Sequence, residues 1–365
     1  MTAKLVFENL KHRPMRSLLS FLLIGVPVTL ILTLVGLTHG MIEDSQQRQR
    51  GSGADVVVRG TNAAAAINFS GATLSEGFVN FLQKQPHVQM AVGVLSHNIQ
   101  LPLTVTGIDL DRFTAMSGGF TYLEGGPFRQ PDDVIIDRYY SAERHVHAGD
   151  TIMLMNRPWH ISGVVEGGKL SHIFVPLKIL QEMDSSTGKV SQIFLKLDNP
   201  ANTAAVIQAL KEKLPEYPIY SMEELTSMIN VNNIGGVKEF TWVVVGIGVV
   251  IGFAVVCLSM YMAVLQRTRE IGILKSMGGS NGFILGIVFM EAMLLGVGGT
   301  LLGIAMSFGA KWLIHTFVPA SIQMAIVPVW WPIALGITLA SAAFGALYPG
   351  LRAAHHDPIE ALAYE

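Results

Sequence analysis

The sequence predicts an α+β membrane protein: a four-helix transmembrane bundle with a large external domain between its first and second spans. Two observations lead to this fold class. Half of the 365 residues are hydrophobic and only 14% are charged, which places the chain outside the soluble globular class. Four long segments hold only one Asp, Glu, Lys or Arg among them, and the more polar residues 43–239 separate the first segment from the other three.

Each of the four segments can cross a bilayer, because about 20 apolar residues in a helix span its hydrocarbon core. The last segment contains Pro319, Pro328 and Pro332, which interrupt its first half and leave the second half as the spanning part. We therefore predict transmembrane helices at 17–42, 240–266, 283–312 and 331–351. A cytoplasmic coupling segment at 267–282 joins the second and third, and a short external loop at 313–330 joins the third and fourth.

The positions of the positive charges predict the orientation. Four Lys or Arg residues precede the first span and three lie at 267–275, whereas 313–330 has none. The positive-inside rule then places both termini in the cytoplasm and 43–239 outside, since long domains translocate regardless of charge. A cleaved signal peptide is the alternative reading of the N-terminus. The apolar run there exceeds 15 residues and lacks a small-x-small cleavage site, which favours a retained anchor.

Residues 43–239 alternate strand-like and helix-like segments. Strands and helices at the two ends of this region follow a β-α-β-β-α-β, ferredoxin-like order. Residues 110–190 lie between the halves and carry further short strands, so we expect a mostly β inserted subdomain there. The polar linkers 43–50 and 221–239 can extend the first two spans as a helical stalk. The predicted segments are strands at 54–59, 88–95, 101–108, 192–197 and 217–220, helices at 75–85 and 201–214, and inserted strands at 134–136, 151–155, 160–165 and 172–176.

Both ends of the chain are predicted to lie at the inner membrane surface. Apolar and charged residues within 1–16 fall on opposite sides of a helix, the pattern of an amphipathic helix lying along a membrane. Residues 352–365 follow the last span and form a cytoplasmic tail.

No catalytic or cofactor-binding motif stands out. The nearest string to a phosphate loop, 163–170, has Leu170 where the motif needs a hydroxyl, so any ATP and magnesium must be bound by another chain. His145 and His147, with two further histidines nearby, raise the possibility of a metal site. No Cys supports them and solvated histidines are commoner, so we predict no metal. The net charge of −2 argues against a nucleic-acid partner.

Small residues at four-residue spacing occur in two spans, at Gly248 and Gly252 and at Gly299 and Gly303. Such residues let helix backbones approach closely in lipid. Packing within one bundle and a seam between two copies are both consistent with this pattern. Glu291 is the single ionisable group that we expect to be buried within a span, and we expect it to make a structural hydrogen bond rather than to carry protons or substrate.

The most specific string is RTREIGILKSMGG, which directly follows the second span. As a helix it alternates charged residues with apolar ones and ends at Gly278 and Gly279. It therefore predicts a short amphipathic helix that docks in a groove of a cytoplasmic partner. A loop that only obeys the positive-inside rule is the alternative.

Four motifs in the same order resemble those of the FtsX-like permeases, the membrane subunits of MacB-type and Lol-type (type VII) ABC transporters. They are NLKHRPMRSLLS from Asn9, REIGILKSMGG from Arg269, FMEAMLLGVGGTLLGI from Phe289 and YPGLRAAHHDPIEALAYE from Tyr348. One span precedes a large external domain and three follow it, as in that family, so the resemblance covers nearly the whole chain. It says nothing about the substrate.

The resemblance implies a permease of the bacterial inner membrane that works as a homodimer or paired heterodimer. It implies a cytoplasmic ABC ATPase dimer, with ATP and magnesium on that partner, and a periplasmic adaptor or a lipid or lipoprotein cargo. In the family, ATP-driven closure passes up the stalk to the external domain, whose two parts open and close. The residues that it assigns to ATPase coupling are Arg267, Arg269, Glu270, Ile271, Gly272, Leu274, Lys275 and Gly278.

Two departures from the family pattern accompany this resemblance. No ATPase domain is fused to the chain, so a separate subunit is expected. The tail has His355 and His356 at positions that are often basic and apolar in relatives, and Ala363 at a frequent arginine. The leading hypothesis is an ABC permease for a hydrophobic substrate such as lipid, lipoprotein or drug, or for transmembrane mechanical signalling. The alternative is a membrane-anchored receptor without an ATPase.

Overall fold

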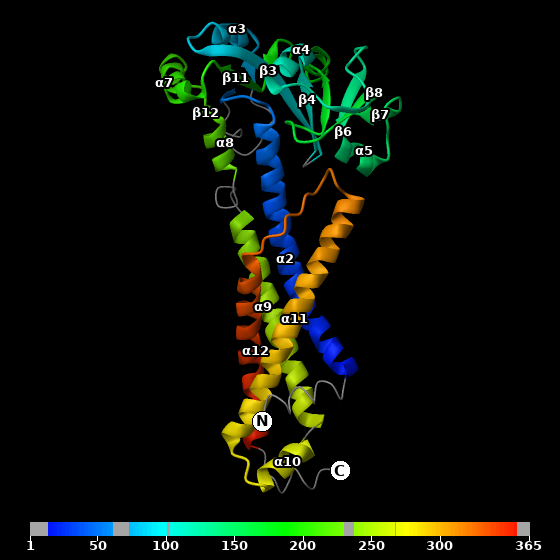
Figure 1. The fold of residues 1–365 in the computed structure, drawn as a ribbon, viewed down its shortest axis with the longest axis vertical. Coiled ribbons are helices and arrows are strands. Elements are labelled where there is room, and N and C mark those ends of the chain that lie inside the picture. Colours follow the sequence, from blue (N-terminus) through cyan, green and yellow to red (C-terminus); the bar gives the residue numbers. More distant parts are fainter. Residues whose placement is uncertain (1–13, 61–72, 101–102, 230–236, 267, 356–365) are drawn as a thin grey trace. The chain divides into compact units, whose positions relative to one another are not determined.

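The computed structural model describes residues 14–60, 73–100, 103–229, 237–266 and 268–355 (Figure 1). The predicted interfacial helix lies almost wholly outside these residues, as does the tail beyond 355. The chain forms two compact units. The helical unit comprises 1–39, 236–313 and 324–365, and the sheet unit comprises 40–235 and 314–323. Helix α2 (Pro14–Arg50) is continuous and supplies residues to both.

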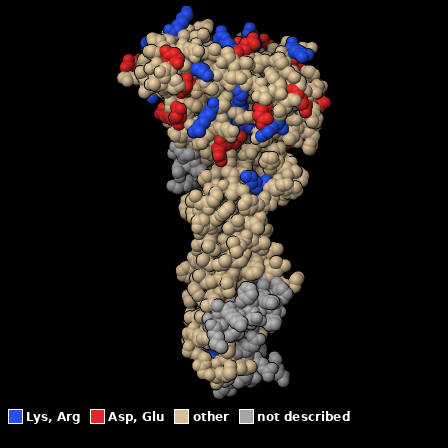
Figure 2. Space-filling view, viewed as in Figure 1, with Lys and Arg blue, Asp and Glu red and all other residues tan. Residues whose placement is uncertain are grey.

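The helical unit contains α9 (Val237–Gln266), the short α10 (Thr268–Ser276), α11 (Asn281–Phe317) and α12 (Trp330–His355), together with the first part of α2. Within the described residues, α2, α9, α11 and α12 are long and apolar enough to cross a membrane. Each extends beyond the predicted apolar segment at one end or both, and α2 includes the whole polar linker 43–50. Lys, Arg, Asp and Glu are almost absent from the helical surface visible in Figure 2 and frequent on the sheet unit.

The core of the helical unit is built from small and β-branched residues. Ile24 of α2, Val256 and Met260 of α9, Ala292 of α11 and Ala342 of α12 belong to one buried cluster. Helix α9 is the least covered: 17% of its most apolar window is buried, compared with 44% for the other three spans. Most of its apolar surface is therefore left uncovered by the described residues.

The sheet unit is built on one ten-stranded mixed sheet with the order β12-β1-β11-β3-β4-β9-β6-β8-β5, in which β7 pairs with β8. Its first part consists of β1 (Val56–Arg59), β3 (Val88–Gln100), β11 (Gln192–Leu197) and β12 (Ile219–Ser221), all paired antiparallel. Helices α3 (Gly77–Gln83) and α7 (Thr203–Lys213) connect these strands in sequence. A separate two-stranded pair joins β2 (Leu74–Ser75) to β10 (Lys189–Val190).

The inserted region extends the same sheet. Its strands are β4 (Leu103–Ile108), β5 (Tyr122–Gly125), β6 (Asp133–Asp137), β7 (Thr151–Leu154), β8 (Arg157–Val165) and β9 (Ile173–Pro176). Strand β3 links the two parts, because Val88–Val94 pair with β11 and Leu95–Gln100 pair with β4. The predicted strand at 101–108 therefore belongs with the insertion: β4 pairs parallel with β9 on its other side.

The insertion also contains three short helices that the sequence reading omitted: α4 (Leu110–Ser117), α5 (Arg138–Arg144) and α6 (Leu177–Met183). Asp109 and Asp137 cap two of them, each accepting a hydrogen bond from a backbone N–H three residues later. The expectation of a mostly β insertion was too simple, because these seven- and eight-residue helices are too short to show a clear 3.6-residue period.

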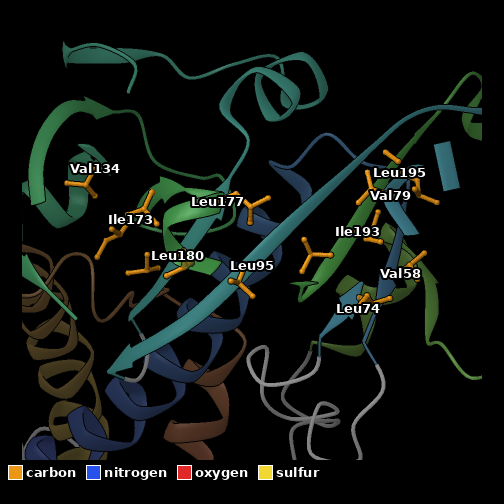
Figure 3. Packing of buried hydrophobic residues seen from close by; sticks show 14 of the residues in the cluster. Val58, Leu74, Val79, Leu95, Val134, Ile173, Leu177, Leu180, Ile193 and Leu195 are labelled. Carbon is orange, nitrogen blue, oxygen red and sulfur yellow. The ribbon is translucent and has the colours of Figure 1, made fainter. Parts of the chain in front are cut away.

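Alternating strand residues bury both faces of the sheet. Val56 and Val58 face one cluster, which includes Val79 of α3 and Leu180 of α6. Figure 3 shows part of this cluster, with Leu95 on β3 between two groups of side chains. Val57 faces the opposite cluster, together with residues of α4 and of α8 (Met222–Met228). The sheet is therefore covered on both sides, which fixes the strand register.

Candidate functional site

The coupling segment folds as the predicted short helix α10. The helix ends at Ser276, and Gly278 follows in the left-handed region with a φ of +94°. The N–H of Gly278 donates to the carbonyl of Lys275, and the N–H of Gly279 donates to that of Leu274 over 2.9 Å. This is a Schellman C-cap, in which glycine is favoured because a side chain at positive φ is strained.

The two faces of α10 have different surroundings. Ile271 and Leu274 pack against the buried cluster of the helical unit, and Thr268 caps α9 by donating to the carbonyls of Val264 and Leu265. On the other face Ile273 is 43% exposed and Met277 is 71% exposed. Ile273 on α10 and Met277 just after it are therefore two apolar side chains that the described residues leave uncovered. The sequence pattern puts Ile271, Leu274 and Met277 on one apolar face for docking to a partner. In the structure Ile271 and Leu274 instead pack within the chain, and Met277 stays exposed.

Of the charged residues of the coupling motif, the structure describes the side-chain contacts of Lys275 alone. Lys275 donates from Nζ to the carbonyl of Ala354, 2.8 Å away in the last turn of α12, so this cation ties α10 to another helix of the same chain. A cation near a helix C-terminus is stabilised by the helix dipole. Arg267 and the side chains of Arg269 and Glu270 lie outside the described residues. Gly272 is buried within α10.

Three of the four predicted packing glycines, Gly248, Gly299 and Gly303, make close contacts within the chain. A Cβ added at Gly303 would lie 2.7 Å from Val28 of α2, and one at Gly299 would lie 2.5 Å from Ile24. Thr29 Oγ1 of α2 also donates to the carbonyl of Gly303 over 3.1 Å. The α2–α11 contact therefore depends on small residues. Gly248 faces Ile31 of α2 at 2.8 Å, whereas Gly252 is close only to Ser341, at 4.0 Å.

The buried ionisable residue of the spans, Glu291, is 7% exposed in α11 and is not isolated, since it has an interaction partner. Val288, Ala292 and Leu295 beside it are also buried. The surroundings are apolar, so the carboxyl group is enclosed by the helices rather than turned towards lipid.

A buried polar cluster anchors the end of α2 in the sheet unit, and the sequence reading did not identify it. Arg48 is 5% exposed, and its Nε donates to Asp44 over 2.7 Å. Its Nη1 donates to Asp137 Oδ2 and to the carbonyl of Ser171, each over 3.3 Å. His172 Nδ1 lies 2.8 Å from the same Asp137 oxygen and donates to it. We call these five residues the Arg48 cluster.

The Arg48 cluster joins three elements, because Asp137 ends β6 and caps α5 while His172 precedes β9. Removing one member of a buried ion pair leaves an uncompensated charge and costs about 3–5 kcal/mol. Gln46 strengthens the same attachment by donating from Nε2 to the carbonyls of Thr226 and Ile229 at the end of α8. The last turns of α2 are therefore fixed to the sheet unit by buried polar contacts rather than by a linker.

A second attachment holds the connection between α11 and α12. Glu143 of α5 accepts hydrogen bonds from the N–H groups of Ala320 and Ser321, each over 2.9 Å, and from Ser321 Oγ over 2.5 Å. Ala320 is 3% exposed and belongs to a buried cluster of the sheet unit. The predicted external loop at 313–330 thus has one segment, 314–323, that is part of the sheet unit.

The histidines considered for a metal pair with separate acids. His147 lies 3.1 Å from Glu124, and His160 lies 3.0 Å from Asp133. The hydrogen bond from the backbone N–H of Ala148, and then the one from the imidazole of His147, lower the pKa of Glu124. His145 instead ends α5 in the left-handed region. Across the described ranges, no three His, Cys, Asp or Glu side chains form a group that could hold a metal ion.

Comparison with known proteins identifies the family. Residues 17–213, more than half of the chain, match the MacB-like periplasmic core domain. Residues 242–358 match the FtsX-like permease C-terminal domain. The chain belongs to the MacB/FtsX family of ABC transporter permeases. Membership implies association with a membrane and with an ATPase partner, and the four span-capable helices with a periplasmic-type domain fit a bacterial inner-membrane protein.

Three relatives illustrate the similarity. The uncharacterized ABC transporter permease YknZ of Bacillus subtilis is 24% identical over 403 residues, which cover 99% of this chain and 98% of that protein. The macrolide export ATP-binding/permease protein MacB of Escherichia coli K12 is 25% identical over 315 residues, 78% of this chain. The chain spans about half the length of the MacB relatives that it matches, 48% for this one. The crystal structure of the periplasmic region of MacB from Actinobacillus actinomycetemcomitans covers 49% of this chain and 94% of that one, with 16% identity and a TM-score of 0.37.

Proposed function

We propose that the chain is the permease subunit of an ABC transporter and passes work from a separate cytoplasmic ATPase to its external domain. The ATPase binds the ATP and magnesium, and this chain carries out no catalysis. Both termini lie in the cytoplasm, and a second permease copy completes the membrane part. The work is used to export or extract a hydrophobic substrate, such as lipid, lipoprotein or drug, or to signal mechanically across the membrane.

The observation that carries this proposal is the arrangement of α10. Its packed face and the Lys275–Ala354 bond fix it to the helical unit, and its outer face presents Ile273 and Met277. A short amphipathic helix with apolar anchors is suited to a groove on a partner protein. A force on α10 reaches α9 and α12 directly through Thr268 and Lys275.

Two buried attachments support transmission into the external domain. The Arg48 cluster fixes the end of α2 to β6 and β9, and Glu143 fixes the 314–323 segment to α5. Both attachments hold the inserted part of the sheet. The first span and the α11–α12 connection are therefore each attached, through different residues, to the inserted region.

The strand order β12-β1-β11-β3, with the helices α3 and α7 connecting these strands, supports a ferredoxin-like frame for the first part of the external domain. In the family pattern the frame and the insertion open and close against each other. Here β3 runs through both parts, so separation within one chain would break the β3 pairing with β11 or β4. We therefore propose that the sheet unit of each copy moves as one body.

The test is copurification of the full chain from native membranes with an ABC-type ATPase, followed by measurement of ATP turnover. We expect M277E combined with I273E to abolish copurification and to remove the stimulation of turnover, because two charges would be desolvated in an apolar groove. E270R tests the charged face of the coupling motif. The matched control is E182R, at an exposed position of α6 in the sheet unit, which should leave both readouts unchanged.

If the double variant still copurifies with the ATPase and still stimulates its turnover, α10 is not the ATPase-docking helix. A chain that binds no ATPase in native membranes would instead favour a membrane-anchored receptor, the second candidate. The observation that favours a receptor is a cavity in the sheet unit of a size suited to a small ligand.

A further inference from the structure

The sheet unit contains a cavity of about 390 Å³, within the range of small-molecule sites, roughly 300–1,000 Å³. All of its lining residues belong to the sheet unit. One wall is the last three turns of α2, from Met41 to Gln49, and another is Ala320–Gln323 of the α11–α12 connection. The floor is formed by β3, β4 and the start of β11.

The floor is a polar patch in an otherwise apolar sheet face. Ser96 pairs with Thr106 across β3 and β4, and Val94 pairs with Gln192 across β3 and β11. The same face of these strands is apolar further along, where Val92 and Phe194 pack in the buried cluster. Polar side chains on a buried sheet face lower the stability of the fold unless they form hydrogen bonds. Their presence on this face therefore requires a reason.

Four of the lining polar groups lack partners in the part of the chain that the structure describes. Thr106 is 2% exposed and Ser96 is 8% exposed, and their hydroxyl groups make no hydrogen bond to described residues. The Oε1 atoms of Gln192 and Gln49, residues that are 4% and 7% exposed, are buried without a partner. An unpaired buried polar group costs about 1–3 kcal/mol, and a ligand bearing hydrogen-bonding groups would recover part of that loss.

The charges at the cavity argue against an anionic ligand. Its one guanidinium, Arg48, already binds Asp44 and Asp137, and His172 donates to the same Asp137. The free groups are hydroxyls and amides, which suit neutral hydrogen-bonding partners. Met41, Ile42 and Ile229 provide an apolar surface beside them.

We propose that this cavity binds a neutral amphiphile, with its hydroxyl or amide head on Ser96, Thr106 and Gln192 and its apolar part against α2 and Ile229. Two of the cavity walls continue into spans, through α2 and through the α11–α12 connection. The occupied cavity therefore stiffens the segments that hold the external domain to those spans. The proposal does not rest on the ATPase, because binding is defined by this chain alone.

The test uses the full chain in phosphatidylcholine nanodiscs, without nucleotide, and a monoacylglycerol carrying a diazirine in its acyl chain. After irradiation, peptides are analysed by mass spectrometry. We expect labelling of peptides from 41–49 and 94–106, competed by monolauroylglycerol but not by lauric acid or dodecylamine. Labelling confined to the spans, or equal competition by lauric acid, would overturn the proposal.

Two variants separate binding from folding. S96A combined with T106V removes two hydroxyls with little change in volume. It should reduce labelling of the cavity peptides about thirtyfold, since each hydrogen bond contributes about 1 kcal/mol and about 1.4 kcal/mol corresponds to a factor of ten. S45F adds a ring to the cavity wall from the surface of α2 and should abolish the labelling while the circular dichroism stays unchanged.

T114V, at an exposed position of α4, is the control and should bind as the parent does. Labelling that survives S45F excludes the cavity as the site. A chain that binds the probe but stimulates no ATPase overturns the proposed function and leaves this inference standing.

Discussion

At Arg48, one side chain joins segments that lie up to 123 residues apart in sequence. From the sequence, this residue is one charge in a polar linker, and nothing local distinguishes it from Arg50. Its burial depends on Asp137 and Ser171, which come from the inserted region. Long-range pairing of this kind cannot be predicted from periodicity. The same holds for Glu143, whose partners Ala320 and Ser321 follow a transmembrane helix.

Asp133 gives a prediction on the pH dependence of stability. Burial acts to raise the pKa of this carboxyl group, but hydrogen bonds from the N–H groups of Arg129 and Gln130 and from His160 outweigh burial and lower the pKa below its usual value. The ionised carboxylate therefore stabilises the fold. Its contribution is complete above the unfolded-state pKa of about 3.9 and is lost as the pH falls through the lower folded-state pKa.

We expect D133N to lower the free energy of unfolding by about 1–3 kcal/mol at pH 7, because the amide offers one acceptor oxygen in place of two. The deficit should shrink below about pH 4, where the parent loses the same charge. Calorimetry of the detergent-solubilised chain across this pH range measures both effects. A deficit that stays constant down to pH 3 would show that the charge is not responsible.

Among the elements, α2 and α11 are held together by the close approach of their backbones. Gly25 takes part as well, since a Cβ there would lie 3.2 Å from the carbonyl of Gly299. The sequence reading identified the Gly299 and Gly303 spacing but left open whether it served one bundle or two copies. The contacts with Ile24 and Val28 favour packing within the chain at this pair. Gly248 contacts α2 in the same way, and Gly252 has no such close neighbour in the described chain.

Replacing Gly303 with alanine should therefore destabilise the helical unit, because the new methyl group would meet Val28 and the carbonyl of Gly25. We expect a loss of about 1–3 kcal/mol, as for overpacking in other cores. G309A on the same helix is the matched control, since nothing lies within 4 Å of a Cβ there and alanine favours helix. The two variants are compared by thermal unfolding in one detergent. Equal melting temperatures would contradict the packing role.

The elements that the sequence predicts best are those with local signals. Four apolar runs, the glycine end of α10 and the strand Gln192–Leu197 follow from composition, capping and alternation. The helices α4 to α6 do not follow from such signals, since each is shorter than nine residues. The predicted strand 88–95 ends too early, since β3 continues to Gln100. The missed part of the strand includes Ser96 and Asn98, polar residues that line the cavity and interrupt the apolar alternation.

For the whole molecule, the orientation is the prediction with the widest consequence. In a C257A background, single cysteines at Glu182 and Val329 should react with a membrane-impermeant maleimide in intact spheroplasts. A cysteine at Ser276 should react only after lysis, because the positive-inside rule places α10 in the cytoplasm. Labelling of all three positions from one side would contradict the predicted orientation, because α10 and the sheet unit would then lie on the same side of the membrane.

The course of β3 has a further consequence. Its thirteen residues form one uninterrupted backbone through the frame and the insertion, with hydrogen bonds to a different neighbour in each half. A strand paired along its length resists both stretching and shear, so the sheet has no built-in hinge at Leu95. Spectroscopic rulers placed across this junction should read a constant separation throughout an ATP cycle, and those placed between two copies of the chain should be the ones that change.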